Sequence, residues 1–152
     1  MQKLSANADE IVGIIINLGQ FVPFQEIEKV HWYVVDVEKI TLLLSSLTRR
    51  LARSELRMRM AKFEDAEALS IKIKKIEEQL KDAKIIDNLL KDKCKMILQK
   101  LEKYLNVRTK DYFLNLINNK TKLLITSKEM DEKISLYEDQ MKILISNYIV
   151  KL

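Results

Sequence analysis

Apolar residues recur in alternating steps of three and four along most of this chain, and that spacing is typical of a coiled-coil seam. The first run comprises Val30, Tyr33, Val37, Ile40, Leu44, Leu47 and Leu51. After a weaker stretch, the second run comprises Ile73, Ile76, Leu80, Ala83, Leu90, Cys94, Ile97, Leu101 and Tyr104, with Asp87 as its polar position. Because neither glycine nor proline occurs from Phe24 to Leu152, the usual turn residues are missing between the runs. The pattern predicts one continuous helix over residues 24–104, roughly 120 Å long.

Shorter patterns flank this long helix. Ile11, Ile14, Ile15 and Leu18 share one face of a helix predicted over residues 6–19, which Gly19 and Pro23 separate from the long one. A third helix is predicted over residues 110–150, with the seam Phe113, Leu116, Lys120, Leu123, Ser127, Met130, Ile134, Tyr137, Met141, Leu144 and Tyr148. Residues 106–109 have low helix propensity. They allow either a turn, which folds the third helix back as a helical hairpin, or a kink, which continues the rod.

The predicted fold class is therefore all-α: a long segmented coiled coil that forms a single domain over residues 1–152. A rod of this length cannot bury its apolar stripe against itself, so the stripe needs a partner. We expect a protein whose role is interaction with other helices.

The charge changes this picture only slightly. The formal net charge is +5, from 27 Lys and Arg against 22 Asp and Glu, and lysines alternate with acids in residues 72–78. Such interleaving is typical of a solvated helix face, so the balance does not demand a nucleic acid or a membrane as partner. No stretch reaches the apolar length of a membrane span, and no signal peptide is recognisable. With one cysteine and no intrachain disulfide, a cytoplasmic protein is expected.

Candidates for catalysis are sparse. His31 and Cys94 are the only histidine and cysteine, they lie far apart in sequence, and no glycine-rich loop is present to hold a phosphate. Cys94 falls on the seam, where a free thiol behaves as a small hydrophobe. His31, beside Trp32, is interpreted as a surface or interface residue. No cluster of His, Cys and carboxylates has the spacing of a metal site. Neither enzymatic activity, nor a cofactor, nor a metal is expected.

The densest positive feature is a group of five arginines within eleven residues: Arg49, Arg50, Arg53, Arg57 and Arg59. Arg49, Arg53 and Arg57 share a helix face because they are four residues apart. The guanidinium group offers a rigid fork of donors suited to carboxylate or phosphate. From charge alone, a solvated face of a long helix is the favoured interpretation of the cluster. A DNA-contacting or membrane-surface helix is a weaker alternative, because leucines and acids interrupt the basic run.

At this motif the chain resembles a known family, the C-terminal Shroom domain 2. The family has a leucine run followed by a Ser-Leu-Ser-Gly-Arg-Leu-Ala-Arg-like element and an acid. The corresponding stretch here reads Leu43-Leu44-Ser45-Ser46-Leu47-Thr48-Arg49-Arg50-Leu51-Ala52-Arg53-Ser54-Glu55. Further landmarks follow in the family's order, among them Pro23, Asp82-Ala83-Lys84, Asp111-Tyr112 and Glu129-Met130-Asp131-Glu132-Lys133-Ile134.

The resemblance implies a non-enzymatic scaffold that binds the coiled coil of Rho-associated kinase. Recruitment of the kinase to apical junctions then drives actomyosin contractility and apical constriction. Family members bind actin through a separate region, and the domain itself forms an antiparallel homodimer.

The residues that match the family's kinase-binding element are Ser46, Leu47, Arg50, Leu51, Ala52 and Arg53, with Arg49 in place of the family's glycine. Arg50 and Arg53 are expected to pair with kinase carboxylates. Leu47 and Leu51 also fall on the seam, so they serve either the kinase or the dimer. The alternative function is a purely structural dimeric coiled-coil spacer.

Overall fold

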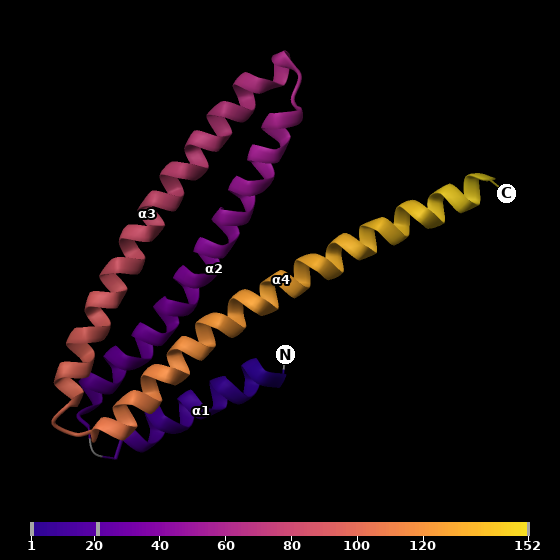
Figure 1. The fold of residues 1–152 in the computed structure, drawn as a ribbon. Helices are drawn as coiled ribbons and strands as arrows, with labels where there is room; N and C mark the ends of the chain where they lie inside the picture. The colour runs from indigo at the N-terminus through magenta and orange to yellow at the C-terminus, as the bar shows by residue number, and fades with distance from the viewer. Residues whose placement is uncertain (1, 21, 152) are drawn as a thin grey trace.

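The computed structural model describes residues 2–20 and 22–151 and arranges them in four α-helices (Figure 1). α1 spans Gln2–Leu18, α2 spans Phe24–Met60, α3 spans Phe63–Leu101 and α4 spans Val107–Lys151. No strand occurs within these two described ranges, and the predicted all-α class is confirmed. The first helix begins four residues earlier than the predicted range 6–19.

The prediction of a single helix over residues 24–104 is wrong. The chain reverses after Met60, and α2 and α3 lie side by side as an antiparallel pair (Figure 1). Two extended residues make the turn: Ala61 has φ −72° and ψ 141°, and Lys62 has φ −69° and ψ 155°. Both φ values are negative and open to any L-residue. The lack of glycine and proline was therefore no barrier to a turn.

The two apolar runs face each other across this pair. Leu47 and Ile76 lie equally far from the turn, as do Ile40 and Ala83, and all four side chains are buried. Because each run repeats in steps of three and four, its seam positions meet those of the other run in successive layers. Each Leu or Ile buried in this way contributes about 1.5–3 kcal/mol. Within one chain, α2 and α3 therefore bury these seam residues against each other.

The segment between α3 and α4 is a turn and not a kink. α3 ends at Leu101, and Asn106 Oδ1 accepts a hydrogen bond of 2.8 Å from the Thr109 backbone N–H. That bond satisfies one of the free N–H groups at the start of α4. The predicted helical hairpin takes a different form, because α4 packs on α1 and α2 rather than along a 24–104 rod (Figure 1).

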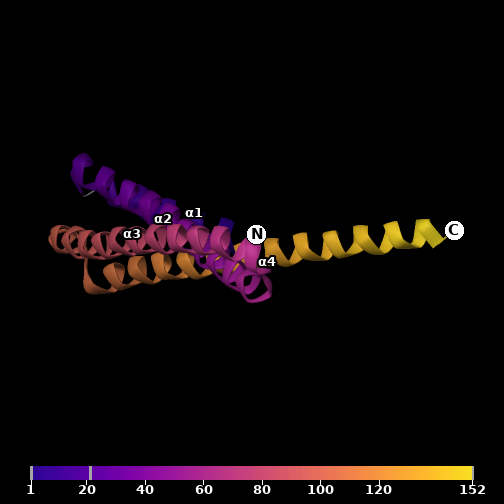
Figure 2. The same ribbon diagram turned by 90° about the horizontal axis from the view of Figure 1, so that it is seen from above.

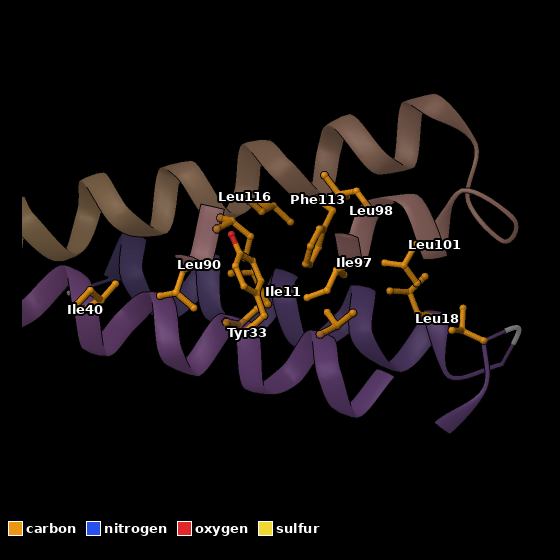
Figure 3. Packing of buried hydrophobic residues seen from close by; sticks show 14 of the residues in the cluster. Ile11, Leu18, Tyr33, Ile40, Leu90, Ile97, Leu98, Leu101, Phe113 and Leu116 are labelled. Atoms are coloured by element: carbon orange, nitrogen blue, oxygen red, sulfur yellow. The ribbon is translucent and has the colours of Figure 1, made fainter. Parts of the chain in front are cut away.

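The common core lies at the end of the molecule where these helices meet (Figure 3). Ile11 and Leu18 of α1 are buried there together with Ile97, Leu101 and Phe113. Nearby, the buried Nδ2 of Asn7 donates a hydrogen bond of 3.1 Å to the Leu116 carbonyl oxygen. These contacts attach α1 to the first turns of α4.

The C-terminal half of α4 has no such packing, and Figure 2 shows it projecting beyond the other helices. All described residues from Lys133 to Lys151 are exposed. Among them are the seam residues Ile134, Tyr137, Met141, Leu144 and Tyr148. No helix within residues 2–20 and 22–151 combines the length and apolarity needed to cross a bilayer.

We predict that Phe113→Ala lowers the free energy of unfolding by about 3–5 kcal/mol, because it leaves a cavity where four helices meet. Phe63→Ala is the matched control, since Phe63 is 96% exposed and Phe113 only 1%. Urea denaturation followed by circular dichroism gives both values. Equal midpoints for the two variants would contradict this core.

Candidate partner-binding surface

The arginine-rich segment lies in the second half of α2, and the helix divides its residues between two environments. Leu47 is 2% exposed and faces the packing with α3. Ser46 and Leu51 are half-buried, whereas Arg50, Ala52 and Arg53 are exposed. The predicted binding residues therefore do not form one surface. Arg50, Ala52 and Arg53 face outward, and Leu47 belongs to the core of this chain.

Arg49 and Arg53 converge on a single carboxylate of α4. Arg53 Nη2 donates a hydrogen bond of 3.1 Å to Glu132 Oε1, and Arg49 Nε lies 3.1 Å from the same oxygen. The Arg49 contact is an ion pair by distance but is not aligned as a hydrogen bond, since Nε and Nη1 have no hydrogen-bond partner among the described residues. Arg49 Nη2 donates to Ser45 Oγ at 2.9 Å. Arg50 makes no ion pair within residues 2–20 and 22–151.

Sequence reasoning did not identify Glu132 as part of this surface. It stands 79 residues after Arg53, in a helix whose path depends on the turn at residues 102–106. Glu132 belongs to the family landmark that ends at Ile134, and this was the signal that could have drawn attention to it. The landmark alone does not indicate that Glu132 pairs with an arginine.

A second ion pair ties α2 to α4 nearer the common core. Lys120 Nζ lies 3.3 Å from Glu38 Oε2. Lys120 was a polar position in the predicted third seam, and this contact explains how a charge is accommodated there. Because Glu38 precedes Arg49 as Lys120 precedes Glu132, α2 and α4 run in the same direction across these contacts.

Between the two ion pairs lies a cavity of about 680 Å³ bounded by α2, α3 and α4. Val37 and Leu44 line it from α2, Leu90 from α3, and Ile117 and Ile125 from α4. The helices therefore do not close over this stretch. Arg49 is the arginine that lines this cavity.

Tyr33 lines the same cavity, where burial raises the pKa of its phenol above the ordinary value and the neighbouring Cys94 thiol raises it further. Tyr112 has a pKa raised by its hydrogen bond to Glu10, in which the phenol donates to Oε2 at 2.6 Å. Both phenols therefore stay neutral at physiological pH. They act as packing and hydrogen-bonding groups of the fold.

The two residues considered for catalysis lie on different helices, and the described residues show no hydrogen bond between them. His31 is exposed and packs edge-on to Trp32, with ring centroids 5.5 Å apart. Cys94 is half-buried on α3. Across the described part of the chain, no group of three or more His, Cys, Asp and Glu side chains is arranged to hold a metal ion.

Comparison with known proteins decides the family. The family model for the Apx/Shroom domain ASD2 matches residues 2–148. This chain belongs to the Apx/Shroom ASD2 family. It is 31% identical to Protein Shroom4 of Homo sapiens over 150 residues, which cover 95% of this chain and 10% of that protein. Identity to Protein Shroom2 of Xenopus tropicalis is 31% over 123 residues, 78% of this chain and 7% of the relative.

Protein Shroom4 of Mus musculus gives a similar figure, 29% identity over 147 residues, again 95% of this chain and 10% of the relative. The chain thus spans about a tenth of the length of the curated Shroom4 proteins that it matches. The ASD2 domain is a scaffold-type domain, and the Shroom resemblance seen in the sequence is confirmed over almost the whole chain.

We predict that Leu47→Asp and Ala52→Asp separate the two environments of the arginine segment. An aspartate at the buried Leu47 loses apolar contacts and places an unpaired charge against α3, so unfolding free energy falls by at least about 3 kcal/mol. At the exposed Ala52 the same residue costs less than about 1 kcal/mol in helix propensity. Thermal melts measure both effects. A loss of less than about 1 kcal/mol for Leu47→Asp would contradict its place in the core and indicate that Leu47 belongs to the partner surface.

Proposed function

We propose that this domain is a non-enzymatic scaffold that binds the coiled coil of Rho-associated kinase through the arginine surface of α2. This surface is formed by Ser46, Arg49, Arg50 and Arg53, which share one side of α2. The matched segment also includes Leu51 and Ala52, on other faces of the helix. The observation that carries the proposal is the exposure of Arg50 and Arg53, one turn apart, within a segment that matches the ASD2 family. Arg50 has its donors free of any carboxylate in the described residues.

The chemistry suits an acidic helix. Guanidinium groups pair with carboxylates in a bidentate manner. Acidic residues three or four positions apart share one face of a helix. This spacing matches that of Arg50 and Arg53, which are three residues apart. Leu47 supplies no apolar contact to the partner, because it is buried against α3. Leu47 is therefore no longer part of the proposed surface.

The activities of a longer protein follow from this binding step. Recruitment of the kinase to the cytoskeleton at apical junctions would raise actomyosin contractility there and drive apical constriction. Actin would be bound by regions beyond these residues, since the chain corresponds to about a tenth of its Shroom4 relatives. These statements extend the proposal to the whole protein.

Charge reversal tests the surface directly. Arg50→Glu together with Arg53→Glu is expected to abolish capture of this chain by an immobilised coiled-coil fragment of Rho-associated kinase, because it replaces two attractive contacts with two repulsive ones. Helicity, measured by circular dichroism, is expected to stay unchanged. Arg50→Glu alone is informative too, since Arg50 has no intrachain ion pair among the described residues.

The matched control is Lys81→Glu with Lys84→Glu on α3. These lysines have the same spacing of three residues and are exposed, so the control changes net charge by the same amount at another surface. Equal loss of binding in both double variants would point to a general electrostatic attraction. A folded wild type that does not bind would leave the structural spacer as the function.

We also propose that two copies associate by exchanging the α2–α3 pair. The turn at Ala61–Lys62 has no left-handed residue and no side-chain cap at either end. Its sequence therefore tolerates a straight helix, which would place α3 of one copy against α2 of another in the same antiparallel layers. Such an exchange would produce the homodimer expected from the family. It would use the same α2–α3 contacts that form within one chain.

Lys62→Pro discriminates the hairpin from the exchanged dimer. The Lys62 φ of −69° suits proline, and the Lys62 N–H donates no backbone hydrogen bond in the turn. Proline would therefore fit the hairpin but cost about 3 kcal/mol in a continuous helix. Light scattering after size exclusion is expected to show a shift from dimer to monomer. An unchanged dimer would rule out exchange at this turn.

A further inference from the structure

One carboxylate of this chain already occupies the surface proposed for the kinase. Glu132 Oε1 lies 3.1 Å from both Arg53 Nη2 and Arg49 Nε. We infer that residues 120–151 of α4 form a displaceable strap, in which Glu132 stands in for a partner carboxylate, and that the partner helix binds by taking the place of the strap. The inference rests on the proposed function, since it concerns how the same surface is controlled.

The strap is attached less firmly than the rest of the chain. The buried residues of α4 are Phe113, Leu116 and Ile117, all near its start. Farther along, Leu123 and Leu124 are only half-buried, and the cavity of about 680 Å³ lies beneath this stretch. The strap is thus held over α2 mainly at its two ion pairs, Lys120 with Glu38 and Glu132 with the arginines.

Ion pairs of this kind yield readily to a competitor. The Glu132 side chain is 33% exposed and that of Arg53 is 62% exposed, so water screens their attraction. Arg49 is less exposed, at 17%, but its Nε contact with Glu132 is not aligned as a hydrogen bond. A partner carboxylate would recover the same contacts with Arg49 and Arg53. It would also bring acids within reach of Arg50, which the strap leaves without a carboxylate. The exchange therefore favours an acidic partner.

The cavity adds a requirement for apolar side chains in that partner. When the strap moves away, α4 no longer covers Val37, Leu44 and Leu90, and a partner can contact them. The matching ligand is a helix that carries carboxylates three or four residues apart, flanked by apolar residues on the same face. A segment of acidic coiled coil has this pattern. A uniformly charged polyanion lacks the apolar residues that this pattern requires.

Neutralising the internal carboxylate tests the competition. Glu132→Gln is expected to bind the kinase coiled-coil fragment about three- to tenfold more tightly than wild type, because the partner no longer displaces a charged competitor. Glu138→Gln is the matched control: it removes the same charge from the same helix, but Glu138 is exposed and makes no ion pair in the described residues. Calorimetric titration should give the control the wild-type affinity.

A distance measurement tests the strap without relying on affinity. Spin labels at Glu55→Cys on α2 and Ser135→Cys on α4, in a Cys94→Ser background, report the separation of the two helices; both labelled positions are exposed. Glu132→Gln alone is expected to lengthen and broaden the distance distribution. A saturating amount of kinase coil is expected to do the same to the wild-type chain.

Two results would overturn the strap. One is equal affinity of wild type and Glu132→Gln for the kinase coil. The other is a distance distribution that neither the substitution nor the saturating partner changes. If wild type does not bind the kinase coil, the proposed function fails by itself. In that case the distances in Glu132→Gln, compared with those in Glu138→Gln, decide whether the strap exists.

Discussion

Packing of the α2 seam against the α3 seam is the interaction on which the rest of this molecule depends. Ile40, Leu47, Ile76 and Ala83 are all nearly removed from water at positions equally spaced about one turn. Burial of this series contributes to offsetting the entropy of ordering two helices of 37 and 39 residues. It also supplies the platform that fixes the direction of every outward-facing residue on α2.

That platform explains the division within the arginine segment. Once Leu47 points into the pair, the helical repeat of 3.6 residues directs Arg49 and Arg53 away from α3, by about 160° and about 120° around the axis. α4 lies on that side and pairs with both residues, so Arg49 and Arg53 lie between the tightly packed α2–α3 pair and a loosely attached helix. A surface in this position can be both well oriented and temporarily covered. Rigid placement limits the entropy lost when a partner binds.

Attachment of α4 changes along its length, from apolar to polar to none. Phe113 and Leu116 are buried in the common core, Lys120 and Glu132 make ion pairs, and residues beyond Glu132 are exposed. Apolar contacts resist separation in water far more than screened ion pairs do. The helix is therefore anchored at one end and released at the other. This gradient suits a domain that exchanges internal contacts for contacts with another chain.

The sequence by itself determined the helical class, the seam positions and the family, because heptad spacing and an ordered series of landmarks are local properties of the chain. It also determined that Arg49, Arg50 and Arg53 form the densest positive group. The sequence did not determine where the chain reverses: Ala61 and Lys62 carry no turn signature, and only the burial gained by α2 and α3 selects the turn. Nor did it determine the roles of Leu47 and Glu132. Tertiary packing decided both, because seam spacing is the same whichever helix supplies the opposite face, and because an ion pair across 79 residues depends on the path of the whole chain.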